Sequence, residues 1–274
     1  MKNWLAPLSF LALTLASPLT ANAEVLIAPT RVVLENGERS AELVIVNKGD
    51  EEAAFRVSIE NRRMTTDGSM ETAETPKTGE LFAIDHVRYS PRRVVLEPGG
   101  RQTVRVSLKS LNLAPGEYRS HLRLKSAPTS AGRTLQSAGS DGGDGISIQL
   151  VAIRSLTIPI IARVGELEAK VSLDSAKLKN ISHTEGSTTL EARLMRKGSK
   201  SVYGDMEIYV SGQSTPVYFA RGIAVYTPNA ERVVKLPLPN SVRDQLKGQS
   251  VRIIYRSSDP KKPEVFGELT TVMN

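Results

Sequence analysis

The sequence predicts an all-β protein that consists of two β-sandwiches. Apolar and polar residues alternate with a period of two in many short segments, and turn residues separate these segments. No segment has the pattern of a long amphipathic helix. Short strands at this spacing are typical of antiparallel sandwiches and barrels. A length of 274 residues, with 40% hydrophobic and 24% charged residues, fits one large or two ordinary globular domains.

The first half of the chain contains six clear alternating segments. We expect strands within 25–27, 41–46, 55–60, 94–96, 104–108 and 118–125. The turn signals between them are Asn36-Gly37, Lys48-Gly49-Asp50, Asp67-Gly68, Pro98-Gly99-Gly100 and Pro115-Gly116. This order of strands and turns predicts the first sandwich.

The segment 128–145 interrupts the series. It is rich in glycine and serine and has almost no apolar residues, so we expect a long flexible loop. A loop of this length between strands is often functional, and a tolerated insertion would have the same composition.

An apolar run, 146–161, follows the loop and contains Pro159 near its end. A proline is not expected in the middle of a paired strand, so we place the domain boundary between Pro159 and Gly165. One helical turn is expected at 241–246. The second strand series is 169–173, 188–195, 206–210, 217–220, 222–226, 233–238, 251–255 and 265–272. The predicted division is an export segment at 1–23, a first domain at 24–159 and a second domain at 160–274.

The first residues have the pattern of a cleaved secretory signal. Lys2 is followed by an apolar stretch and then by Ala21-Asn22-Ala23, so the mature chain should start at Glu24. The alternative, a membrane anchor, is disfavoured because Pro7 and Pro18 break a short stretch. Removing the segment lowers the net charge from +7 to +6. An exported chain without cysteine fits a bacterial periplasm, and no stable membrane insertion is expected.

Several functional classes are excluded or disfavoured by composition and motifs. The chain has no cysteine, and its three histidines, His86, His121 and His183, are far apart in sequence. These facts disfavour a metal site, and no motif of a nucleophile, phosphate loop or dinucleotide site is present. His121 is expected on the surface because it alternates with Arg119 and Arg123. We therefore predict no enzyme and no cofactor, and the moderate positive charge is weak evidence for nucleic acid.

The apolar run offers a candidate binding strand. One face consists of Ile146, Ile148, Leu150 and Ala152, and eight residues pass without charge or proline. Proteins usually guard an edge strand of this kind against aggregation. It is therefore either a central strand protected on both sides or an edge kept free so that another polypeptide can add to it.

Two arginines are candidates for binding a negatively charged group of a partner. Arg31 lies in an otherwise apolar stretch soon after the expected mature start, and Arg154 ends the uncharged run. Two arginines near the domain junction could bind a carboxylate with charge-assisted hydrogen bonds, whereas each alone could be an ordinary surface residue.

Four further segments belong with the export signal and the apolar strand. They are Thr30-Arg31, Pro98-Gly99-Gly100-Arg101-Gln102-Thr103-Val104-Arg105-Val106, Glu117-Tyr118-Arg119-Ser120-His121-Leu122 and Ile158-Pro159-Ile160. Together these features resemble the periplasmic pilus-assembly chaperones of the chaperone–usher pathway. The resemblance covers the first domain well and the second mainly by length and β content, and the form of the Glu117–Leu122 motif suggests a less typical branch.

The resemblance implies two immunoglobulin-like sandwiches in a boomerang with a cleft between them. It also implies a chaperone that donates an edge strand to pilus subunits, anchors the terminal carboxylate of the bound subunit with two basic residues, and serves an outer-membrane usher. Arg31 matches the first basic residue. The usual lysine motif of the second is absent, so Arg154 is assigned and Arg163 is the alternative.

Two other functions remain to be compared with a chaperone. A structural fimbrial component or adhesin is also exported and β-rich, but it would be expected to carry an N-terminal donor extension and to lack one strand. An enzyme or sugar-binding sandwich is poorly supported, because aromatic residues make up only 5% of the chain.

Overall fold

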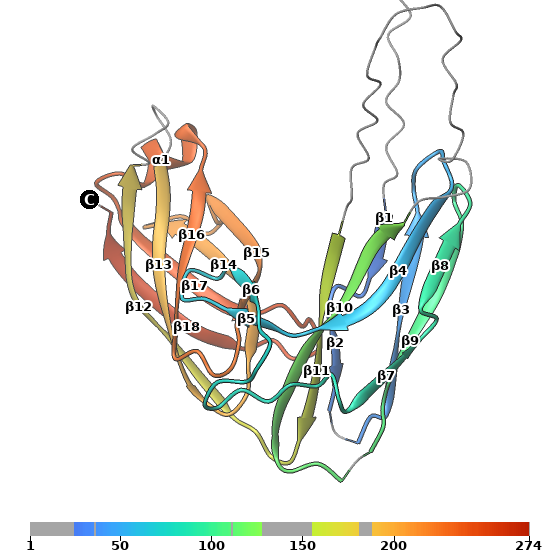
Figure 1. Cartoon of the computed structure of the whole chain (residues 1–274). Helices are drawn as coiled ribbons and strands as arrows, with labels where there is room; N and C mark the ends of the chain where they lie inside the picture. The colour runs from blue at the N-terminus through green and yellow to red at the C-terminus, as the bar shows by residue number, and fades with distance from the viewer. Residues whose placement is uncertain (1–24, 36, 111, 128–154, 181–187, 274) are drawn as a thin grey trace, which may run out of the picture.

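The computed structural model describes residues 25–35, 37–110, 112–127, 155–180 and 188–273. Within these residues the chain forms two β-sandwiches and one short helix, α1 (Asn240–Leu246), so the predicted fold class is confirmed. Figure 1 shows the sandwiches as two arms that meet where the first leads into the second and diverge toward their other ends.

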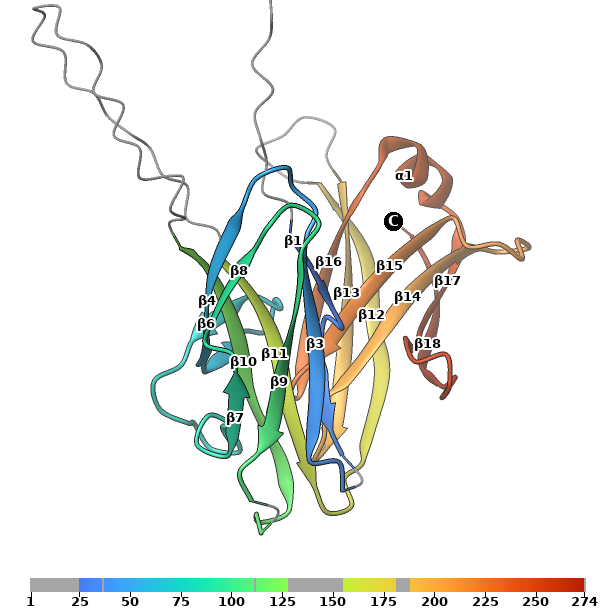
Figure 2. The same cartoon turned by 90° about the vertical axis from the view of Figure 1, so that its right-hand side faces the viewer.

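The first sandwich has two sheets, as expected for strands along which apolar and polar residues alternate. One sheet has the order β1 (Val25–Ala28), β3 (Ser40–Asn47), β9 (Arg101–Leu108) and β7 (Val87–Ser90). The other has the order β2 (Val32–Leu34), β11 (Ser155–Val164), β10 (Gly116–Ala127), β4 (Ala53–Glu60) and β8 (Arg93–Leu96). Figure 2 shows the layer of β4, β10 and β11 beside the layer of β3 and β9.

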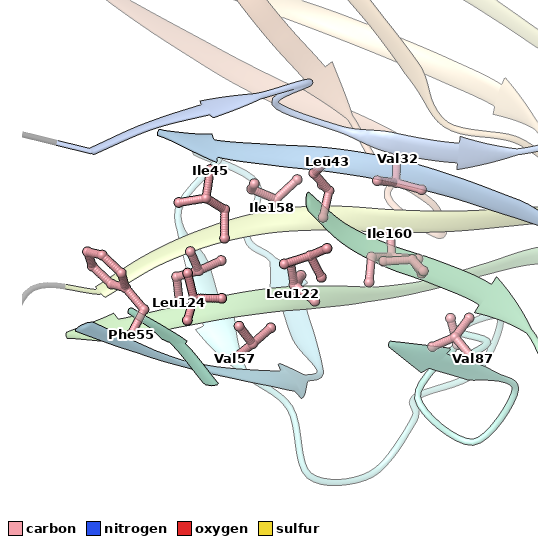
Figure 3. Close-up of a cluster of buried hydrophobic side chains, with 14 of the residues drawn as sticks. Val32, Leu43, Ile45, Phe55, Val57, Val87, Leu122, Leu124, Ile158 and Ile160 are labelled. Atoms are coloured by element: carbon pink, nitrogen blue, oxygen red, sulfur yellow. The ribbon is translucent and has the colours of Figure 1, made fainter. Parts of the chain in front are cut away.

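The first core lies between these two layers (Figure 3). Leu43 and Ile45 alternate along β3 and are fully buried, as the sequence predicts. Leu122 on β10 lies directly opposite Ile158 on β11, and both belong to the same cluster. Burying one such aliphatic side chain contributes roughly 1.5–3 kcal/mol, so this alternation is sufficient to fix which face of each strand is inside.

The second sandwich has a three-stranded and a four-stranded sheet. The first has the order β12 (Ala169–Asn180), β13 (Thr188–Gly198) and β16 (Glu231–Leu238). The second has the order β15 (Tyr218–Val225), β14 (Val202–Val210), β17 (Ser250–Ser257) and β18 (Val265–Val272). Its core includes Leu190, Leu194, Met206, Ile208 and Tyr255, all fully buried.

Strand β11 continues through Pro159, which the sequence placed at the end of the first domain. Residues 160–164, expected in the second domain, pair with β10 and β2 and belong to the first sandwich. Pairing with β2 begins only at Ile160, so at Pro159 the strand has a paired neighbour on one side, among the described strands. A proline without an N–H group fits such an edge position. The change of domain therefore falls at Gly165.

The two sandwiches are joined by a hairpin that the sequence did not predict. Strands β5 (Arg62–Met64) and β6 (Met70–Thr72) leave the first sandwich and reach the second (Figure 1). The Asn229 side chain donates to the Met64 carbonyl at 2.9 Å, and the Val233 N–H donates to the Thr66 carbonyl at 2.7 Å. The hairpin therefore fixes one domain against the other.

Part of the sequence prediction lies outside the described residues. This applies to the export segment 1–23, the loop 128–145, the strand face of Ile146, Ile148, Leu150 and Ala152, and Arg154. In the part of the chain that the structure describes, no helix has the length and apolar character needed to span a membrane.

Candidate binding site between the two domains

A pocket of about 280 Å³ lies at the junction of the two sandwiches. We call it the junction pocket. The first domain contributes Arg31, Val33, Glu35, Ile161 and Arg163 to its lining. The second domain contributes, among others, Lys200, Ser201, Tyr203, Tyr226 and Lys262. The pocket therefore exists only when both domains are in place.

Arg31 reaches this pocket because the chain changes sheets just before it. β1 pairs with β3 in one sheet, whereas β2 pairs in parallel with β11 in the other, with Val32 opposite Ile160. Arg31 is the residue that enters β2. It therefore lies where the pairing of β2 with β11 begins.

The Arg31 guanidinium is half-buried against an aromatic ring. Its central carbon lies 3.4 Å from the ring centroid of Tyr203 in the second domain, a close cation–π contact. Its buried Nη1 has no hydrogen-bond partner within the described residues. Burial is the largest influence on the pKa of Arg31 and lowers it, and the nearby charge of Arg163 adds to this effect against the opposing tyrosines. A partly desolvated cation with no hydrogen-bond partner among the described residues is a strong candidate for binding an anion.

Arg163 lies in the same pocket, but its hydrogen bonds are already made. Its Nε donates to Glu117 at 3.0 Å, its Nη1 to Glu35 at 2.8 Å, and its Nη2 to the Ser201 carbonyl at 3.0 Å. Burial would raise the pKa of Glu35, but the hydrogen bond and charge of Arg163, with a smaller effect of Lys262, lower it. Arg163 is thus compensated by two carboxylates.

The choice between Arg154 and Arg163 as the second anchor stays a prediction. Arg163 shares the junction pocket with Arg31. Arg154 lies outside the described residues. Its described neighbour Ser155 is five positions before Ile160, which places Ser155 about 16 Å along β11 from the level of Val32.

The free edge of β11 begins beside Arg31. β2 pairs with β11 only at Ile160, Ile161 and Ala162. On the side away from β10, residues 155–159 have no paired strand among those that the structure describes. Leu156 on this stretch is 45% exposed. The free edge of β11 and the Arg31 guanidinium therefore meet at one place.

The sequence assigned no role of its own to Glu117, although this residue connects the two domains. It is 4% exposed and accepts hydrogen bonds from the Ser201 N–H at 2.8 Å and the Thr227 hydroxyl at 3.2 Å, as well as from the Ser201 hydroxyl and Arg163. Alternating polar residues on a strand usually indicate a solvent face. The period of two cannot reveal that another domain covers that face.

His121 is on the same covered face, so its expected surface position is wrong. It is 3% exposed, and the Tyr226 ring lies edge-on with the ring centroids 6.5 Å apart. Arg119 beside it is 5% exposed, stacks on Tyr226 at 4.5 Å and donates to the Thr227 carbonyl at 3.3 Å. The second domain therefore closes over residues that a single sandwich would expose.

The buried His121 predicts a pH dependence of stability. Burial, with the charges of Arg119 and Arg62, lowers its pKa to about 3. Between that value and the ordinary pKa near 6.5, the unfolded chain binds a proton that the folded chain does not. Stability should therefore fall as the pH drops through this range, by up to about 1.4 kcal/mol per pH unit. Urea unfolding at pH 7, 5 and 4 measures the slope. His121→Phe should flatten it, and an unchanged slope in this variant would contradict the assignment.

Comparison with known proteins gives structural similarity only. No protein-family model matches the chain, and no curated protein matches it in sequence. Among solved structures, the chain is similar to a chaperone–tip subunit pre-assembly complex of the archaic chaperone–usher Csu pili of Acinetobacter baumannii, with 14% identity, a TM-score of 0.48 and coverage of 92% of this chain and 100% of that one.

Two further chaperones are similar to the same extent. The E. coli chaperone DraB has 12% identity and a TM-score of 0.44, with 92% of this chain and 97% of that one covered. The Pseudomonas aeruginosa chaperone CupB2 has 14% identity and a TM-score of 0.44, with 91% and 100% covered. At these TM-scores the similarity carries no argument about function, which depends on the junction pocket and the β11 edge.

Proposed function

We propose that the protein is a periplasmic chaperone that binds pilus subunits through a free strand edge, anchors the terminal carboxylate of the bound subunit and delivers it to an outer-membrane usher. The observation that carries this proposal is the Arg31 guanidinium. It is half-buried, its buried Nη1 has no hydrogen-bond partner within the described residues, and it lies where the free edge of β11 begins.

A carboxylate is the ligand that this guanidinium fits best. A planar guanidinium presents parallel N–H groups that match the two oxygens of a carboxylate, and such charge-assisted bonds are about twice as strong as neutral ones. The stacked Tyr203 ring occupies one face of Arg31, so the edge of the group is left for the ligand. We favour the terminal carboxylate of a chain over the carboxylate of a side chain, because the pocket lies at one end of the free strand edge.

The direction of the strand of the bound pilus subunit, which we call the client, follows from this placement. A client whose terminal carboxylate lies at Arg31 extends away along residues 159 to 155 of β11. Its chain therefore runs from the Ser155 end toward the Pro159 end, parallel to β11. Main-chain hydrogen bonds to the free edge would give affinity, and alternate side chains would give specificity.

The upstream residues supply the apolar part of the interaction. A pilus subunit that lacks a strand exposes its core groove, and the face of Ile146, Ile148, Leu150 and Ala152 is predicted to fill it. Each buried aliphatic side chain contributes roughly 1.5–3 kcal/mol. Release would then occur by exchange with the donor segment of another subunit, without a nucleotide or cofactor.

The alternative, a structural fimbrial component or adhesin, is less well supported. Ile158 and Ile160 of β11 fill the core of their own sandwich, so the described part of the first domain does not lack this strand.

Co-expression with a candidate pilus subunit tests the proposed function. A stable complex of the two chains should elute as one peak on gel filtration, and the mature protein recovered from a periplasmic extract should begin at Glu24. A subunit that aggregates equally with and without this protein would argue for the structural alternative.

Aspartate substitutions on the upstream strand test the donor face. Ile148→Asp and Leu150→Asp should lower client recovery by the equivalent of at least about 1.5–3 kcal/mol, because each places a charge in an apolar groove. Gln149→Asp is the matched control on the opposite face and should matter less. Client yield and circular-dichroism melting of each free variant are the measurements. An Ile148→Asp variant that unfolds alone would assign this face to the protein's own core, leaving Val151 and Ile153 as candidates.

A further inference from the structure

Arg31 is held in the junction pocket by a residue from the other domain. Tyr203 lies on β14 of the second sandwich, and its ring supports the guanidinium of Arg31 from the first sandwich at 3.4 Å. Both side chains line the junction pocket. No polar partner within the described residues orients this arginine, so the ring is the contact that fixes its plane.

Two glycines lie close to Tyr203, one beside it on β14 and one against its ring. Along β14, Val202 and Gly204 are buried and face inward, so Tyr203 between them faces outward toward the first domain. A β-carbon at Gly204 would collide with the Arg256 carbonyl and lie 2.7 Å from the Tyr255 ring. Glycine therefore allows β14 to approach β17 closely.

Gly222 leaves room for the other end of the ring. A β-carbon at this position would lie only 2.9 Å from the Tyr203 hydroxyl oxygen. Gly222 also has a φ of +76°, a conformation that favours glycine. The ring of Tyr203 thus lies between a glycine of its own sheet and the arginine of the opposite domain.

We infer that Tyr203 is a positioning residue that holds the Arg31 guanidinium in the orientation needed to bind a carboxylate, so that both domains build the anchor. This inference rests on the proposed function. An arginine side chain has many rotamers, and a stacked aromatic ring removes most of them before the ligand arrives. The pocket then presents a preformed edge of N–H groups instead of a mobile cation.

The test compares two probe peptides on three proteins. The two probes are acetylated peptides with the same sequence of alternating valine and threonine. One ends in a free carboxylate and the other in an amide. The wild-type protein should bind the carboxylate form at least about tenfold more tightly than the amide. Tyr203→Phe keeps the ring face and should retain this ratio. Tyr203→Leu removes the ring and should lower the ratio about tenfold.

The ratio separates positioning from a general loss of structure. A reduced folded fraction weakens both probes equally and leaves the ratio unchanged. If Tyr203→Leu does not fold, Tyr203→Met fills similar space without a π face and replaces it. A full ratio in the leucine or methionine variant would overturn the role of Tyr203. A wild-type protein that binds both probes equally, or neither, would overturn the carboxylate anchor and with it the proposed function.

Discussion

Replacing Arg31 by alanine should nearly abolish client binding while the free protein remains folded. Removing one partner of a buried, hydrogen-bonded charge pair costs about 2–5 kcal/mol, which corresponds to roughly 30-fold to several thousand-fold in affinity. In the free protein Arg31 has no hydrogen bond to lose within the described residues, only its contact with Tyr203. The free variant should therefore lose only this cation–π contact, about 1–2 kcal/mol of stability, and remain folded.

Client recovery on co-expression and thermal melting of the free protein measure the two effects separately. For the stability of the free protein, Arg163→Ala is the comparison, because this arginine is bonded to Glu117, Glu35 and Ser201. Its loss should destabilise the free protein more than the loss of Arg31 does. Arg154→Ala, measured beside it, decides which residue is the second anchor. An Arg31→Ala variant that recovers client at the wild-type level would rule out the clamp.

Replacing Glu117 by alanine should destabilise the junction by about 3–5 kcal/mol. The change removes a buried carboxylate and leaves the Arg163 guanidinium and the Ser201 and Thr227 donors without it. Because these donors come from both domains, the domains should also become less firmly coupled. We expect a lower melting temperature and faster proteolysis at the connection after Val164.

Glu42→Ala provides the matched control for this variant. Glu42 pairs with Arg105, but both side chains are exposed, and such a surface pair contributes about 0–1 kcal/mol. Circular-dichroism melting and limited proteolysis of the two variants are the measurements. Equal melting temperatures for Glu117→Ala and Glu42→Ala would show that the buried network does not hold the domains together.

The strands were predictable because one face of each is in a core. Leu43 and Ile45, or Leu122 and Leu124, repeat at two-residue spacing and are all buried, and burial of apolar area dictates that pattern. The turn glycines between strands were equally informative, since Gly37, Gly68 and Gly99 all have positive φ. The pattern is local, so a single sequence contains it.

The domain junction was much less predictable. Glu117, Arg119 and His121 alternate as a solvent-facing series would, yet another domain covers them. The stack of Tyr203 on Arg31 joins residues far apart in the chain, and no periodicity predicts such a contact. Pro159 suggested the end of a strand because the sequence does not reveal that β2 starts to pair one residue later. Of the charged residues in the pocket, Arg31 was identified because an arginine in an apolar stretch is conspicuous, and Arg163 was named only as the alternative second anchor.

Amide hydrogen exchange along β11, in the free protein and in a complex with its client, tests the central claim most directly. We predict that the amides of residues 155–158 that do not face β10 exchange rapidly in the free protein and become protected in the complex. The outer edge of β8, at the opposite side of the same sheet, should exchange equally in both states and serves as the control. A client complex in which residues 155–158 exchange as in the free protein would contradict strand addition at this edge.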